Sequence, residues 1–164
     1  MTGAGSKNIT RRLLAALVVA AMAAGCSTQP SGPAARSAPA RDSRTAAALL
    51  AIATVFNNDY DSGRYGPVYD RWDIRSQAII TRDDYIRRHT ECPSAPQTAR
   101  TEDASPDPGG AWLVDYEIDG VQLRDYWFYV NGRWAFDLIR SNPSSVSLYK
   151  LTPRQYLTAL GCAR

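Results

Sequence analysis

Lysine, histidine and cysteine are scarce in this chain, and their scarcity limits the chemistry that it can support. Its 164 residues include only Lys7 and Lys150, one histidine and three cysteines. A single histidine and the lack of closely spaced cysteines argue against a bound metal. We also find no Ser/His/Asp order, no phosphate-binding loop and no pair of carboxylates at a spacing typical of catalysis. We therefore expect neither a metal nor a cofactor.

An excess of one charge is also missing once the N-terminal segment is set apart. The chain has 19 basic and 16 acidic residues, and Lys7, Arg11 and Arg12 lie in a segment without acids. Nineteen less these three leaves 16 basic residues, equal to the acidic ones. Nucleic-acid binding needs a clustered basic surface, so we expect no nucleic-acid partner. The preference for Arg over Lys, with many Ala residues, is typical of GC-rich genomes such as those of actinomycetes.

The first 25 residues have the pattern of a cleavable signal peptide. The three basic residues precede an apolar run over 13–24 that is too short for a comfortable membrane anchor. The run ends in Ala23-Ala24-Gly25-Cys26, which resembles the lipobox of bacterial lipoproteins. The resemblance implies cleavage after Gly25, diacylglycerol on the Cys26 sulfur and retention on the extracytoplasmic face of the cell membrane. The alternative is a secreted protein in which Cys26 occurs by chance.

Residues 26–43 and 44–164 differ in composition. The first stretch is rich in Ser, Pro and Ala without apolar periodicity, which indicates a flexible, lipid-anchored linker. The second is long enough to bury its own core. With Cys26 assigned to lipid, Cys92 and Cys162 remain, and we expect a disulfide between them in an oxidising compartment. This bridge would fasten the C-terminal helix to the helical half of the domain.

Helical patterns come first in residues 44–164. We expect a helix over 43–58, capped by Ser43, with a buried stripe of Leu49, Ile52, Val55 and Phe56. A short helix over 67–72 follows, and then one over 82–91 with Thr81 as its cap. A last helix begins with the capping box Thr152-Pro153-Arg154-Gln155 and ends at Gly161.

The middle of the domain alternates apolar and polar residues with a period of two. Three such runs, over 111–118, 121–130 and 133–140, are separated by Asp119-Gly120 and Asn131-Gly132. These dipeptides are strong signals for β-hairpins. A further strand is expected over 97–102, with a loop over 105–110. Helices followed by an antiparallel meander indicate an α+β fold with the N-terminal helices packed on one sheet face, plus a C-terminal helix.

This order of elements resembles the nuclear transport factor two-like superfamily. The stretch from Tyr-Asp-Arg-Trp (69–72) to Ile-Ile-Thr-Arg-Asp-Asp-Tyr-Ile (79–86) is similar to the helical entry of that fold. The resemblance covers about residues 44–140 and rests on element order rather than on a catalytic motif. It implies a curved sheet wrapped around a long helix in a cone-like arrangement. The C-terminal helix departs from the usual pattern of the family.

The two-residue turns predict which side chains share a face of the sheet. In this register Trp112 faces Trp127, and Asp125 faces both Val114 and Leu138. Apart from Asp125, one face carries only apolar and aromatic residues: Trp112, Val114, Tyr116, Ile118, Val121, Leu123, Trp127, Tyr129, Trp134, Phe136 and Leu138. The wetter face places Asp115 opposite Arg124, Glu117 opposite Gln122, and Tyr126 opposite Asp137.

Asp125 is the one charged residue on the aromatic face. Burial there would raise the pKa of its carboxyl, and in some enzymes of the resembled superfamily an inward acid is the general base. Alternatively, Asp125 lies near the sheet edge or bonds a helix N-terminus or a tyrosine hydroxyl. His89 is the other acid–base candidate, although a lone histidine on an amphipathic helix is more often a surface or packing residue.

The dense aromatic side chains are either plain core or the lining of a pocket for a flat apolar ligand. The possible lining residues are Trp112, Tyr116, Asp125, Trp127, Tyr129, Trp134 and Phe136. The preferred hypothesis is a non-catalytic, lipid-anchored domain that binds a small apolar ligand or an envelope protein. The alternatives are an enzyme that uses Asp125 as a general base on a cyclic or carbonyl substrate, and a structural envelope component. An open cavity on the aromatic face would favour ligand binding or catalysis.

Overall fold

The computed structural model describes residues 41–95 and 97–163, in which helices precede and follow an antiparallel sheet. Four helices come first: α1 (Ala46–Asp61), α2 (Tyr65–Asp70), α3 (Ile74–Gln77) and α4 (Arg82–Glu91). The strands are β1 (Ala99–Pro106), β2 (Trp112–Ile118), β3 (Val121–Val130) and β4 (Arg133–Phe136). Three short helices follow: α5 (Leu138–Ser141), α6 (Pro143–Tyr149) and α7 (Pro153–Ala159). The fold is therefore α+β, as the sequence predicts.

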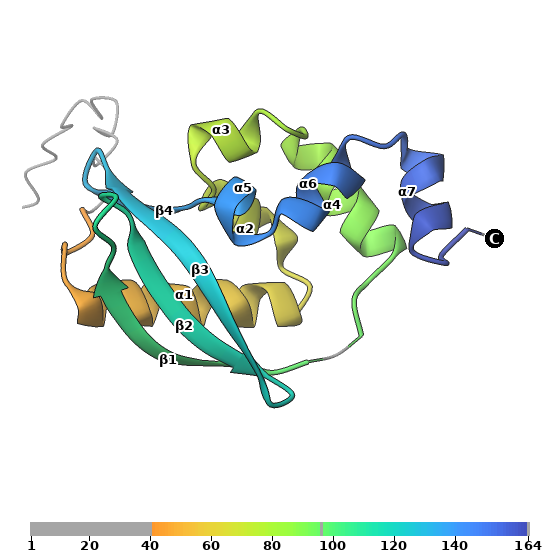
Figure 1. Ribbon diagram of the computed structural model, residues 1–164. Coiled ribbons are helices and arrows are strands. Elements are labelled where there is room, and N and C mark those ends of the chain that lie inside the picture. Colours follow the sequence, from red (N-terminus) through yellow and green to blue (C-terminus); the bar gives the residue numbers. More distant parts are fainter. Residues whose placement is uncertain (1–40, 96, 164) are drawn as a thin grey trace, which may run out of the picture. The chain divides into compact units, whose positions relative to one another are not determined.

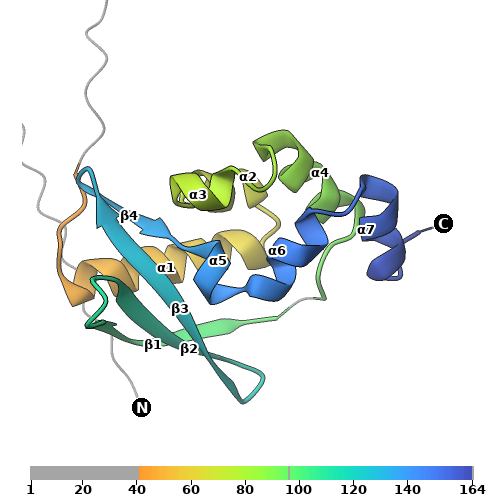
Figure 2. The same ribbon diagram turned by 45° about the horizontal axis from the view of Figure 1, so that its top comes forward.

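The four strands form one open sheet in the order β1-β2-β3-β4. Figures 1 and 2 show α1 running along this sheet, with the other helices gathered to one side. Both hairpins turn where predicted, with φ of 51° at Asp119 and 53° at Asn131, followed by Gly120 and Gly132 at 81°. Positive φ at both central residues is what a type I′ turn requires. The predicted register is confirmed: Trp127 pairs with Trp112 on one side and with Phe136 on the other.

Strand β1 differs from its prediction in position and length. It begins at Ala99 rather than at 97 and continues through Pro106, into the stretch expected to be a loop. A bulge between Thr101 and Asp103 shifts its register against β2. On the exposed side, Arg100 forms ion pairs with Glu102 (2.6 Å) and with Glu117 of β2 (2.8 Å).

Helix α1 is shifted three residues towards the C-terminus relative to its prediction. Thr45, not Ser43, is its cap, because the Thr45 hydroxyl accepts the Ala48 N–H (3.2 Å). The helix also continues to Asp61, three residues past its predicted end at 58. Its buried face consists of Leu49, Ala53 and Phe56. Val55, predicted to be buried, is 58% exposed because it lies on the opposite side of this stripe.

The core between α1 and the sheet is aromatic. The ring of Phe56 lies 5.2 Å from that of Trp127, edge to face, and 4.8 Å from that of Phe136. Thr54 of α1 and Thr101 of β1 share a hydrogen bond beside this contact. Burial of each large aromatic ring typically contributes about 2–3 kcal/mol to the free energy of unfolding.

The largest departure from the predicted fold lies after β4. The strand expected over 133–140 ends at Phe136, and the chain turns into α5 and then α6, neither of which was predicted. The expected pairing of Asp125 with Leu138 therefore does not form. Asp137, expected on the wetter face, is fully buried. Helices α4 and α7 begin as predicted, with Thr81 as a cap and a complete capping box at Thr152 and Gln155. Helix α2 begins two residues before Pro67.

The folded domain begins earlier than residue 44. The Asp42 N–H donates to the Gly132 carbonyl (2.8 Å), and the Asp42 carboxylate accepts from the Trp134 N–H (2.9 Å) and from Arg71 (2.8 Å). The signal peptide, Cys26 and the rest of the linker lie outside the described residues. None of the described helices combines the length and apolar character needed to cross a membrane.

The predicted disulfide joins Cys92, at the end of α4, to Cys162, after α7, with Cα atoms 5.6 Å apart. Beside it, the buried Arg88 of α4 donates to the Leu151 carbonyl (3.0 Å), and its guanidinium lies 5.2 Å from the ring centre of Tyr156 on α7. The disulfide and this contact together hold α7 against α4.

Replacing both Cys92 and Cys162 by Ser should lower the free energy of unfolding by up to about 4 kcal/mol. The cross-link closes a 70-residue separation, and the entropy of the unfolded chain rises when it is removed. Urea denaturation of residues 27–164, with and without the two substitutions, measures this change. Two free thiols in the unfolded, unreduced protein would contradict the disulfide itself.

Candidate functional site

A cavity of about 280 Å³ lies between α1, the Asp119-Gly120 end of the sheet and α6. Much of its wall is aromatic: Phe56, Tyr60, Trp72, Tyr85, Tyr116, Phe136 and Tyr149. Its polar lining consists of Asn57, Asp61, Gln97, Asp125, Asn142 and Ser145. Mostly apolar walls with a few convergent polar groups are typical of sites for small ligands.

Asp125 lies on β3 and faces this cavity, opposite Val114 as the sequence predicts. Its side chain is almost completely buried (6% exposed). Its one hydrogen bond to another described side chain is a long one of 3.4 Å, donated by the Tyr116 hydroxyl. The alternative of a bond to a tyrosine hydroxyl is thus realised. Burial without a cationic partner raises the pKa of Asp125 to about 7, although the Tyr116 bond acts in the opposite direction.

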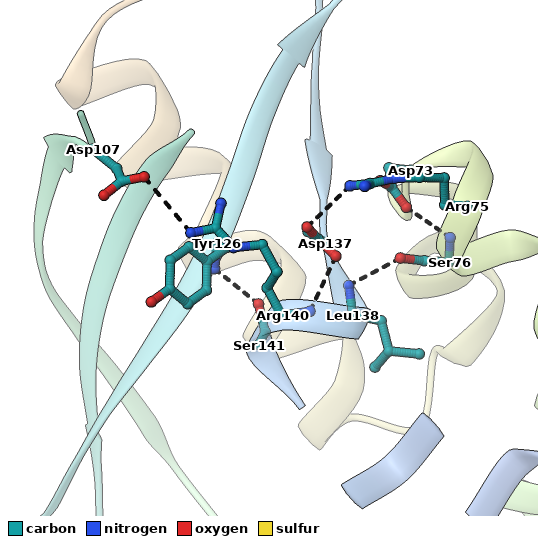
Figure 3. A network of polar contacts seen from close by, with 9 residues as sticks. All are labelled: Asp73, Arg75, Ser76, Asp107, Tyr126, Asp137, Leu138, Arg140 and Ser141. Atoms are coloured by element: carbon teal, nitrogen blue, oxygen red, sulfur yellow. Dashed lines mark hydrogen bonds and ion pairs between the residues drawn. The ribbon is translucent and has the colours of Figure 1, made fainter. Parts of the chain in front are cut away.

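The α5–α6 wall of the cavity depends on the turn that follows β4. Figure 3 shows the buried Asp137 carboxylate at this turn. Its Oδ1 accepts the Arg140 N–H (3.1 Å), and its Oδ2 accepts from Arg75 (3.2 Å). The Ser76 hydroxyl accepts the Leu138 N–H (3.0 Å). These partners cap the first turn of α5, because the Leu138 and Arg140 N–H groups, which have no carbonyl partner within the helix, are satisfied by side chains.

The same turn ends the β3–β4 pairing from the other side. The Tyr126 N–H of β3 donates to the Ser141 hydroxyl of α5 (2.8 Å) instead of to a strand neighbour. Arg140 lies over the Tyr126 ring, with its guanidinium carbon 3.9 Å from the ring centre (Figure 3). Helix α5 is therefore fixed to β3 by a hydrogen bond and a cation–π contact.

Helix α6 carries site residues that the sequence analysis missed. The Asn142 side chain caps this helix by accepting the Ser145 N–H (3.1 Å), and Pro143 occupies its first turn. Asn142, Ser145 and Tyr149 then line the cavity. An Asn-Pro pair is a recognisable helix start, and it was the signal that could have revealed this element.

Three of the seven predicted lining residues line the cavity, namely Tyr116, Asp125 and Phe136. Trp127 and Trp134 are fully buried in the core, and Trp112 packs edge to face on Trp134 with ring centres 5.3 Å apart. The Tyr129 hydroxyl donates to the Asp42 carbonyl. Much of the aromatic face is therefore core, whereas the part near Asp125 lines the cavity.

His89 does not line this cavity. It is buried in α4, and its Nε2 forms a hydrogen bond with the Tyr149 hydroxyl (2.8 Å). Burial lowers the pKa of His89 to about 4, so the ring is neutral near pH 7. The two acid–base candidates, Asp125 and His89, thus do not form one catalytic pair.

Within residues 41–95 and 97–163, no group of three or more His, Cys, Asp or Glu side chains is placed to hold a metal ion. Comparison of the chain with protein-family models, with curated proteins and with solved structures found no match.

Replacing Asp125 by Asn should stabilise the domain at pH 8 and leave its stability nearly unchanged at pH 4. The raised pKa means that the folded state holds a proton that the unfolded state releases, so stability falls as the pH rises from about 4 through about 7. Asn does not ionise, so the variant avoids this loss of stability. The pKa shift of Asp125 corresponds to at most about 4 kcal/mol in the free energy of unfolding. Urea denaturation of both proteins at pH 4, 6 and 8 measures the difference.

Asp103→Asn is the matched control, because Asp103 is an exposed acid on β1. Its effect should stay within about 0.5 kcal/mol at every pH. An Asp125→Asn difference that is equally small at all three pH values would show that Asp125 is solvated.

Proposed function

We propose that this chain is a lipid-anchored extracytoplasmic protein whose folded domain binds a small, largely apolar ligand in the cavity beside Asp125. The observation that carries the binding function is a cavity of about 280 Å³ with a buried carboxylate and no basic side chain among its described lining residues. A carboxyl group kept in such surroundings lowers stability when it ionises. Ionisable groups whose surroundings destabilise their charged form in this way are often found at functional sites.

The membrane anchor is proposed from the sequence alone. The basic residues before an apolar run, and the small residues before Cys26, support cleavage and lipidation at Cys26. Two or three acyl chains would give stable anchoring to the cell membrane. The disulfide between Cys92 and Cys162 supports an oxidising location.

We also propose that the domain is a variant of the cone-shaped nuclear transport factor two-like fold. The order of helices followed by an antiparallel meander supports this, as does the aromatic contact of α1 with β3 and β4. Helices α5, α6 and α7 are additions to that pattern, and α6 would close the open end of the cone.

A general-base enzyme is the second candidate function. It is favoured by the pKa of about 7 at Asp125, which is near the value at which a general base works best in neutral solution. The Tyr116 hydroxyl donates a hydrogen bond to this carboxyl (3.4 Å). Asp125-dependent exchange of the α-hydrogens of a cyclic ketone in D₂O would favour the enzyme over the binding protein.

Replacing Cys26 by Ala should release the protein from membranes. The thiol is the proposed acylation site, and the uncleaved apolar run is a poor anchor by itself. Fractionation of cells labelled with radioactive palmitate measures both the label and the location. Acyl label that persists on the variant, or a variant that stays tightly bound to membranes, would contradict the lipid anchor.

Filling the cavity should weaken the binding of a neutral aromatic probe. In a protein of residues 27–164, we expect added indole to shift the NMR signals of the residues that line the cavity. The Ile118→Trp substitution should reduce the affinity for indole at least about tenfold, because the larger side chain occupies the cavity. Val121→Trp is the control, because Val121 pairs with Ile118 but is 58% exposed and does not line the cavity. Equal binding of indole by the wild type and Ile118→Trp would contradict the cavity as the site.

A further inference from the structure

The cavity differs from the rest of the domain in its charges. Its titratable lining groups are Asp125, Asp61 and tyrosines, and no Arg, Lys or His is among the described lining residues. Elsewhere most acids pair with arginine, among them Asp42, Asp59, Asp70, Asp73, Asp84, Asp115 and Asp137. None of the ion pairs within the described residues includes Asp61 or Asp125.

The two carboxyl groups line the cavity from different elements. Asp125 comes from β3, and Asp61 comes from the last turn of α1. The Asp61 carboxylate accepts the Ala99 N–H in a long bond (3.4 Å), and burial raises its pKa. A positive charge in the space that both residues line would therefore be attracted by two acids and would meet no cationic side chain from the lining.

The aromatic walls favour the same kind of ligand. Rings from α1, α4, β2, β4 and α6 line the space together with the two acids. The face of an aromatic ring carries partial negative charge, so it attracts an ammonium group, and the attraction is stronger where water is excluded. Arg88, a buried cation of the described domain, lies over Tyr156 and does not line the cavity.

We propose that the cavity binds a small organic cation, a protonated or quaternary amine, whose nitrogen is held by Asp125 and Asp61 and whose carbon atoms pack on the aromatic walls. This inference rests on the proposed ligand-binding function and adds the charge of the ligand. A bound cation stabilises the ionised form of Asp125, so binding releases a proton when the free site is protonated.

The other titratable groups of the cavity lining predict a simple pH dependence. These are Tyr116 of β2, Tyr60 and Asp61 of α1, Tyr85 of α4 and Tyr149 of α6. Burial raises the pKa of each of these tyrosines, so they stay neutral between pH 6 and 8. Asp125, with a pKa of about 7, changes from mostly protonated to mostly ionised over this range. Affinity for a cation should therefore rise with pH.

The test compares choline with its neutral isostere 3,3-dimethylbutan-1-ol by calorimetry on residues 27–164. We expect choline to bind at least about tenfold more tightly at pH 8. Its affinity should fall about tenfold at pH 6, whereas the affinity for the alcohol should not change. Asp125→Asn should reduce the preference for choline to about twofold or less, and the exposed control Asp103→Asn should leave it unchanged.

Four results would overturn the inference. Equal or tighter binding of the alcohol by the wild type, or a choline affinity independent of pH and of Asp125, would exclude a cation site. If indole binds and choline does not, the proposed ligand-binding function is supported and the proposal of a cationic ligand is rejected. If choline, the alcohol and indole all fail to bind, both proposals fall. The pH series on the wild-type protein needs no substitution, so a folding defect in a variant cannot obscure the outcome.

Discussion

The hydrogen bonds of the buried Asp137 carboxylate determine where the sheet ends, and the cavity depends on that end. If β4 continued to pair with β3, Leu138 would lie beside Asp125 in the sheet. The bonds from Arg75 and from the Arg140 N–H turn the chain into α5 instead. Helix α6 then follows and supplies Asn142, Ser145 and Tyr149 to the wall. Strand β4 is thus about four residues shorter than predicted, and α6 lines the cavity that this shortening leaves.

Two buried aspartates, only twelve positions apart in sequence, have opposite surroundings. Asp137 has an ion pair with Arg75 and a backbone N–H partner, so its charge is compensated and it acts as a structural anchor. Asp125 has a long bond from a neutral tyrosine and faces a cavity. Because burial disfavours an uncompensated charge, the pKa of Asp125 is raised. This difference in partners, rather than burial itself, distinguishes the candidate site from the core.

The parts of the fold that the sequence predicts are those determined by neighbouring residues. Asp119-Gly120 and Asn131-Gly132 specify their turns locally, and the turns set the register that directs Asp125 inward. The end of β4 could not be predicted in this way, because Arg75 and Ser76 lie 62 residues before their partners Asp137 and Leu138. The sequence placed Tyr116, Asp125 and Phe136 in a possible pocket, but the lining that α1 and α6 contribute could not be predicted for the same reason. Helix α6 is different, because the pair Asn142-Pro143 is a local signal for the start of a helix.

The open sheet has a further consequence for how copies of this protein behave when they are crowded together. Within the described residues, β1 has no strand on its outer side, and a free edge can recruit the edge of another molecule. Here the bulge between Thr101 and Asp103 interrupts the even spacing of N–H and C=O groups, and Pro106 removes a donor. Charged residues at 100, 102 and 103 would also have to be desolvated by any added strand. The edge is thus protected against intermolecular β-pairing, the first step by which concentrated sheet proteins aggregate.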